Sequence, residues 1–112
     1  MVADPTRVAP GETMAMRFPK ETLRGVAFQL DRRDGDDWST HYWMTSDGNG
    51  GNPVSVPVGT EGYGVADVGV AGPGPDHVWI PDDVTPGAYR ICTVNAGDEF
   101  CATIEIVDEK QR

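Results

Sequence analysis

The 112-residue chain has no long hydrophobic run and no stretch with the 3.6-residue periodicity of an amphipathic helix. No apolar segment approaches the roughly 18 residues of a transmembrane helix, so we expect no direct membrane insertion. Lysine occurs only at Lys20 and Lys110, and 18 acidic against 9 basic residues give a formal net charge of −9. This balance disfavours nucleic acid and anionic membranes as partners and is compatible with cations or a basic protein.

Residues that commonly carry catalysis are also scarce. His41 and His77 are the only histidines, and no Gly-x-Ser-x-Gly nucleophile motif surrounds any serine. The paired carboxylates Asp36-Asp37 and Asp82-Asp83 fall in expected turns, where aspartate is favoured because it bonds to the local backbone. We therefore expect a protein with no enzymatic activity and no cofactor.

Short runs of alternating apolar and polar residues, separated by glycine and proline, fill most of the chain. About eight such runs with short connections predict an all-β fold, an antiparallel β-sandwich of about 7–9 strands. The length suits one sizeable core, so we expect a single domain over residues 1–112, with its core within about 8–107. The predicted core residues are Met14, Met16, Phe18, Val26, Phe28, Leu30, Tyr89, Ile91, Phe100, Ile104 and Ile106.

Residues 86–107 predict a turn and two strands joined by a tight connection. If that connection centres on Ala96-Gly97, Cys92 lies opposite Cys101 on the face that points away from the apolar side chains. Such a non-hydrogen-bonded pair has Cα atoms about 4.5 Å apart, which suits a disulfide. We predict a Cys92–Cys101 disulfide on the outward face; two unrelated thiols are the alternative, and a zinc site lacks a second pair of ligands.

The cysteine pair also bears on where the protein is found. A disulfide implies an oxidising compartment, and we therefore expect a secreted or cell-surface protein. Residues 1–10 lack the basic-then-apolar pattern of a signal peptide, so we expect that a leader was removed.

Two features resemble immunoglobulin-like domains. The segment 84–89, Val-Thr-Pro-Gly-Ala-Tyr, resembles the corner before the penultimate strand, where a tyrosine hydroxyl reaches back to the backbone. The closing strands, Tyr-Arg-Ile-Cys and Phe-Cys-Ala-Thr-Ile-Glu-Ile-Val, resemble the last hairpin of such a sandwich. The chain is also similar to small exported domains of high-GC bacteria that carry a Pro-Gly-x-Tyr-Arg-x-Cys-Thr strand. This resemblance covers about residues 8–107 and implies a fold without specifying an activity.

The chain differs from antibody domains in two respects. Their cysteine lies two residues after the tyrosine and bridges the sheets, whereas Cys92 lies three residues after Tyr89. The disulfide is therefore expected to join the two strands of one hairpin on the outer surface. No tryptophan occupies the core position of the strand 26–30, where we expect Phe28 instead.

Aromatic residues lie on both sides of the expected strand 38–45. Alternation places Trp38 and Tyr42 on one side and His41 and Trp43 on the other, while Trp79 should also face outward. We therefore predict a binding surface made of Trp43, Trp79 and His41. Exposed aromatics stack sugars in carbohydrate modules and anchor protein interfaces, and they also cover the rim of small cores; all three roles stay open.

Four aspartates, Asp31, Asp34, Asp36 and Asp37, are weak candidates for a calcium site, since calcium takes six to eight oxygen ligands. The spacing does not match a helix–loop–helix calcium loop, and the arginines at 32–33 would neutralise part of the charge. The alternative is that these aspartates are turn residues.

The sequence thus predicts an exported, monomeric, immunoglobulin-like module at a bacterial cell surface, without catalysis. Its role would be protein interaction or structural support, and its partner is an unknown protein or glycan. A carbohydrate-binding module that uses exposed aromatics is the alternative.

Overall fold

The computed structural model describes residues 1–17, 27–45, 53–59, 76–94 and 99–108. Within these ranges the chain forms strands and no helix, which agrees with the predicted all-β class. The strands are β1 (Val2–Asp4), β2 (Arg7–Val8), β3 (Thr13–Arg17), β4 (Ala27–Asp34), β5 (Asp37–Thr45), β6 (Val54–Pro57), β7 (Asp76–Trp79), β8 (Gly87–Thr93) and β9 (Cys101–Ile106).

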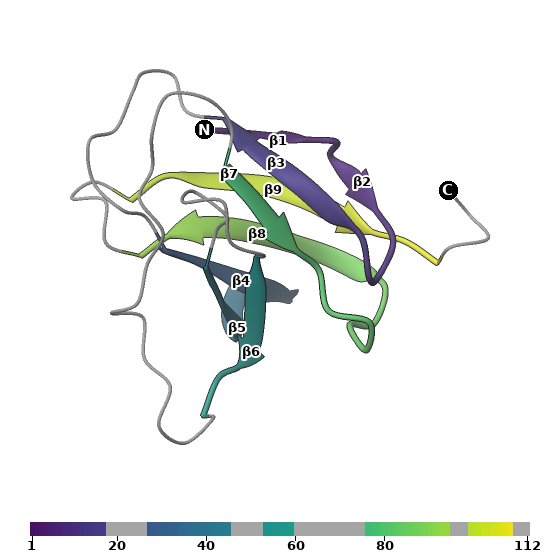
Figure 1. The fold of residues 1–112 in the computed structure, drawn as a ribbon. Helices are drawn as coiled ribbons and strands as arrows, with labels where there is room; N and C mark the ends of the chain where they lie inside the picture. The colour runs from purple at the N-terminus through teal and green to yellow at the C-terminus, as the bar shows by residue number, and fades with distance from the viewer. Residues whose placement is uncertain (18–26, 46–52, 60–75, 95–98, 109–112) are drawn as a thin grey trace.

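The strands build two sheets, one of three strands in the order β1-β3-β7 and one of six in the order β2-β9-β8-β4-β5-β6. Figure 1 shows the smaller sheet lying across one face of the larger, whose β4-β5-β6 end curls away. The order of the larger sheet, with β5 and β6 added beyond β9, β8 and β4, matches that of variable-type immunoglobulin sandwiches. The predicted immunoglobulin-like β-sandwich is confirmed.

The first two strands connect the sheets at their edges. β1 pairs with β3, and β2 pairs with β9 in the one parallel pairing among the described strands. Pro5 lies between them, after a cis peptide bond to Asp4, at a position where no ladder hydrogen bond needs its missing N–H. The β2–β9 contact includes backbone hydrogen bonds from Glu105 N to Thr6 O (2.8 Å) and from Val107 N to Val8 O (2.9 Å).

The core lies between the two sheets, and most of its predicted members are buried. Phe28 has the largest side chain among those that are fully buried. Phe100 is only partly buried, so its assignment to the core was wrong; it directly precedes β9, next to the connection between β8 and β9 and therefore at the end of the hairpin. Phe18 and Val26 lie outside the described residues. The confirmed core residues are Met14, Met16, Phe28, Leu30, Tyr89, Ile91, Ile104 and Ile106.

The corner before β8 has the hydrogen bond that the sequence predicted. Tyr89 Oη donates to the carbonyl oxygen of Thr85 at 2.8 Å. Arg32 Nη1 donates to Thr85 Oγ1 at 3.0 Å, so β4 also contacts this corner. These contacts fix the start of β8 and therefore the position of the residues that follow it.

A β-bulge interrupts the pairing of β4 with β5. Leu30 pairs with Tyr42, but the next residue, Asp31, pairs with Thr40. His41 is therefore an extra residue in β5, and the alternation of sides reverses at this point.

The bulge corrects the predicted side of Trp38. The sequence pattern placed Trp38 on the side of Tyr42, but Trp38 pairs with Arg33 and lies on the outer face of the large sheet, as Trp43 does. Tyr42 packs against the core instead. The simple period of two fails here because it counts His41 as a regular strand residue.

Tyr42 gives a testable pH dependence. Its hydroxyl donates to Asp83 Oδ1 at 2.8 Å, and burial, this hydrogen bond and the Asp83 charge raise the pKa of Tyr42 to about 12. An unfolded tyrosine ionises near pH 10. The stabilisation is therefore complete below about pH 10 and is lost as the pH rises through about 12.

We expect the wild-type chain to lose more stability than Tyr42→Phe between about pH 9 and about pH 11. Urea unfolding at the two pH values measures the difference. Equal losses in the two proteins would show that the folded state does not hold this proton more tightly than the unfolded state.

Candidate functional site

A polar cluster lies on the outer face of the six-stranded sheet, where β4, β5 and β8 run side by side. The register pairs Gln29 with Cys92 and Asp31 with Arg90, so the four side chains share the face opposite the core. Asp31 is only 1% exposed, although it lies on the side that faces away from the other sheet. Its neighbours on this face must therefore cover the carboxylate.

Three side chains donate to the Asp31 carboxylate. Oδ1 accepts from Gln29 Nε2 at 2.8 Å and from Thr40 Oγ1 at 2.7 Å. Oδ2 accepts from Arg90 Nε at 2.8 Å. A buried carboxylate is costly unless it is both paired and hydrogen-bonded, and here both conditions are met.

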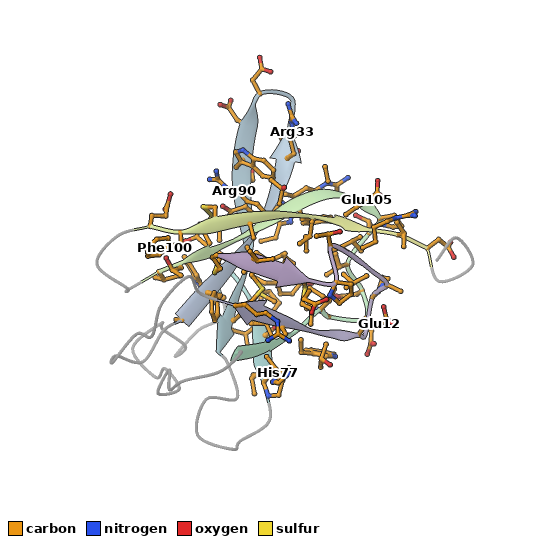
Figure 2. All side chains as sticks on the ribbon, turned by 90° about the horizontal axis from the view of Figure 1, so that it is seen from above. Glu12, Arg33, His77, Arg90, Phe100 and Glu105 are labelled. Atoms are coloured by element: carbon orange, nitrogen blue, oxygen red, sulfur yellow. A yellow bond between two sulfur atoms is a disulfide. The ribbon has the colours of Figure 1, made fainter. Side chains whose placement is uncertain are left out.

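Trp38 completes the surroundings of Arg90. The Arg90 Cζ atom lies 4.7 Å from the centroid of the Trp38 ring, within the range of a cation–π contact. The bulge at His41 makes this contact possible, because it moves Trp38 to the outer face. The guanidinium is thus fixed by a carboxylate and by an aromatic ring, while 27% of the Arg90 side chain stays exposed. Figure 2 shows Arg90 near the base of the projecting β4–β5 hairpin and Arg33 nearer its end.

The predicted disulfide lies beside this cluster. Cys92 and Cys101 are bonded to each other across the β8–β9 hairpin, with their Cα atoms 4.1 Å apart. The predicted register and face are both confirmed, since Ile91 packs in the core and Cys92 points the other way. Cys101 is exposed, whereas Cys92 is fully covered, with Sγ 3.8 Å from Asp31 Oδ2. The bond therefore forms one wall of the Asp31 cluster.

Replacing both cysteines, as Cys92→Ala with Cys101→Ala, should lower the free energy of unfolding by about 2–3 kcal/mol, because the cross-link restricts the unfolded chain. Urea unfolding of the two proteins measures the change. The intact mass of the unreduced wild type should be lower than the mass after reduction by two hydrogen atoms. Two titratable thiols in the unfolded, unreduced wild type would contradict the bond.

The three residues of the predicted aromatic surface come from different sheets. Trp43 and His41 lie on β5 of the large sheet, and Trp79 lies on β7 of the small one. His41 is exposed, whereas both tryptophans are half-buried. Trp79 Nε1 donates to the carbonyl oxygen of Gly11 at 3.1 Å, which ties this ring to the turn before β3. A joint binding role for the three residues stays a prediction.

The four aspartates proposed for calcium are not gathered into one site. Asp31 is enclosed with Arg90, while Asp34 Oδ2 accepts from Ser39 Oγ at 2.8 Å at the β4–β5 turn. Asp36 and Asp37 are exposed at that turn.

Within the described ranges, the one group of three potential metal ligands within 4.8 Å of one another is Cys92, Glu99 and Cys101. The two cysteines of this group are oxidised in the disulfide. This group therefore offers a metal only the Glu99 carboxylate as a strong ligand.

The sequence prediction missed the Asp31–Arg90–Trp38 cluster. Its one local signal was a carboxylate directly after the apolar run of β4, which we assigned to the calcium candidates. The pairing of Asp31 with Arg90 spans 59 residues and depends on β4 lying beside β8. Local alternation cannot reveal that neighbourhood.

No helix in the described part of the chain is long and apolar enough to cross a membrane. A scan against protein-family models and a search of curated proteins found no match to this chain.

Proposed function

We propose that this protein is a non-catalytic, exported interaction module at a bacterial cell surface. Its contact surface is the outer face of β4, β5, β8 and β9, and its partner is a protein. The observation that carries the proposal is Arg90, which is held between a fully buried carboxylate and the Trp38 ring. Arginine and tryptophan are enriched among the residues that dominate the energy of protein interfaces.

Fold stability alone is a weak reason for this cluster. Replacing a buried ion pair by apolar residues of similar volume is often neutral or stabilising, so a sandwich of this kind has no need of a buried charge on its outer face. A binding role does account for it. Arg90 is fixed before any partner arrives, and less side-chain entropy is lost on binding than with a free arginine.

The surroundings of the cluster support the same role. The Cys92–Cys101 bond holds β8 to β9 beside it, and such bonds persist in oxidising compartments outside the cytoplasm. The formal net charge of −9 disfavours nucleic acid as the partner. A protein surface, which can match a small pattern of charged and aromatic groups, fits the face better.

Matched substitutions on the two sheets test the proposal. Thr103 is exposed and pairs with Arg90 across β8 and β9, whereas Thr13 is exposed on the outer side of the small sheet and pairs with Trp79. The immobilised full chain is used to capture surface proteins of the source cells, and affinity for the captured protein is then measured for Thr103→Tyr and Thr13→Tyr.

We expect Thr103→Tyr to weaken binding by about tenfold or more, because it obstructs the contact surface, and Thr13→Tyr to leave binding unchanged. Equal affinity in both variants would show that the face is not the interface. Binding of neutral glycans in place of any surface protein would favour the carbohydrate-binding alternative.

A further inference from the structure

We propose that Arg90 is a carboxylate-binding site and that its Nη1/Nη2 edge receives one carboxylate of the partner protein. This inference rests on the interaction face proposed above and adds the chemical group that the face recognises. It follows from the hydrogen bonds of Arg90, from the enclosure of Asp31 and from the charges around Trp38.

Arg90 has hydrogen-bonding capacity left over. A guanidinium carries five N–H groups, and Arg90 uses Nε–H for Asp31 Oδ2. Its four Nη hydrogens have no acceptor among the residues that the structure describes. Because 27% of the side chain is exposed, an incoming acceptor can reach Arg90.

The existing ion pair holds the guanidinium without occupying that edge. Asp31 contacts Arg90 through Nε, while its other oxygen accepts from Gln29 and Thr40. Asp31 is 1% exposed, so it cannot swing out to follow the arginine. The two Nη groups therefore form a fork in a fixed position, and this geometry matches the two oxygens of a carboxylate.

A second arginine lies on the same face. Arg33 pairs with Trp38 and follows Asp31 by two residues along β4, which is about 7 Å. Its side chain is exposed, and its Nε donates to the carbonyl oxygen of Gly35. Arg33 thus adds a second positive charge to the face that carries Arg90 and Trp38.

The remaining charge of the protein restricts the ligand. The turn beyond Arg33 carries Asp34, Asp36 and Asp37, and the formal net charge of the chain is −9. Polyanions are repelled by this field. The ligand that fits is a single carboxylate on a neutral or basic segment, namely an acidic side chain whose neighbours in the partner are not acidic.

A nuclear magnetic resonance titration of the full chain tests the site. The probes are the blocked peptide acetyl-Lys-Glu-Lys-amide, its glutamine analogue and sodium glucuronate. The signals followed are the Arg90 Nε–H and the Trp38 indole N–H. We expect both signals to shift with the glutamate peptide, and about tenfold less at equal concentration with the glutamine peptide. Equal shifts with the two peptides would overturn carboxylate recognition. Tighter binding of glucuronate than of the glutamate peptide would overturn the protein carboxylate as the ligand and indicate a sugar acid.

Substitutions at Thr103 supply the matched control. Thr103→Glu places an internal carboxylate opposite Arg90 and should abolish the shifts caused by the glutamate peptide. Thr103→Gln introduces a side chain of the same shape without the charge and should retain these shifts. The position is exposed, so both variants are expected to fold, and their unfolding midpoints check this. If Thr103→Glu and Thr103→Gln give the same peptide response while Thr103→Tyr still weakens binding of the partner protein, the interaction face is supported and the carboxylate site is contradicted. If the glutamate peptide shifts both signals but Thr103→Tyr leaves the affinity for the partner protein unchanged, the carboxylate site is supported and the proposed interface is contradicted.

Discussion

Phe28→Ala is expected to lower the free energy of unfolding by about 3–5 kcal/mol, the usual cost of removing a buried aromatic ring. Phe28 is fully buried in β4, where it pairs with Met44 on one side and Thr93 on the other. Both neighbouring strands belong to the centre of the large sheet, so they cannot close the space that the ring leaves. Since small domains have about 5–15 kcal/mol of stability in total, the variant should be close to unfolding.

Urea unfolding measures this loss, and Val54→Ala is the matched control. Val54 is 45% exposed on the edge strand β6, and its truncation should change stability by about 0.5 kcal/mol or less. A loss below about 1 kcal/mol for Phe28→Ala would contradict a close-packed core around the ring.

Arg90→Met should lower the free energy of unfolding by about 3–5 kcal/mol, because it leaves the Asp31 carboxylate enclosed without its counter-charge. Gln29 and Thr40 would still donate to Asp31, but neither carries a positive charge. The methionine retains much of the apolar stem of the arginine. The cost therefore reports the loss of charge pairing more than the loss of volume.

The double variant Asp31→Leu with Arg90→Met separates the cost of an unpaired carboxylate from the cost of the lost arginine contacts. It removes both charges, so most of the stability lost in Arg90→Met should return. Guanidinium chloride unfolding would obscure a charge effect, and urea is the suitable denaturant. If the double variant is no more stable than Arg90→Met alone, the enclosed carboxylate is not the cause of the loss.

Local features of the sequence were sufficient to predict the all-β class and the register of the β8–β9 hairpin. The spacing of Cys92 and Cys101 around a short turn fixed their pairing, and the structure contains that pair and its disulfide. The resemblance of residues 84–89 to an immunoglobulin-like corner likewise implied that the Tyr89 hydroxyl reaches back to the backbone, and in the structure it donates to the carbonyl oxygen of Thr85. These features depend on residues close together in the chain, where turn length and alternation leave little freedom.

Two features that regular alternation does not encode could not be predicted in this way. The extra residue His41 has no distinctive sequence signal, yet it decides that Trp38 faces outward. Asp31 and Arg90 come together only because β4 and β8 are neighbours, an order that alternation does not encode. The candidate site lies where this local irregularity of the β4–β5 hairpin meets the long-range pairing of β4 with β8, and for that reason its residues were predicted in other roles.

The parallel pairing of β2 with β9 determines how the domain responds to mechanical load. β2 is approached from the N-terminal end of the chain and β9 leaves toward the C-terminal end, so a pull on the two ends acts at opposite ends of this pair. The hydrogen bonds of Glu105 and Val107 to the β2 region, together with the Arg7–Glu105 ion pair at 2.9 Å, are then loaded together in shear. Bonds loaded in parallel must break simultaneously, whereas bonds that are peeled break one at a time. Once β1 has been pulled from β3, the β2–β9 edge of the large sheet is therefore expected to resist tension along the chain.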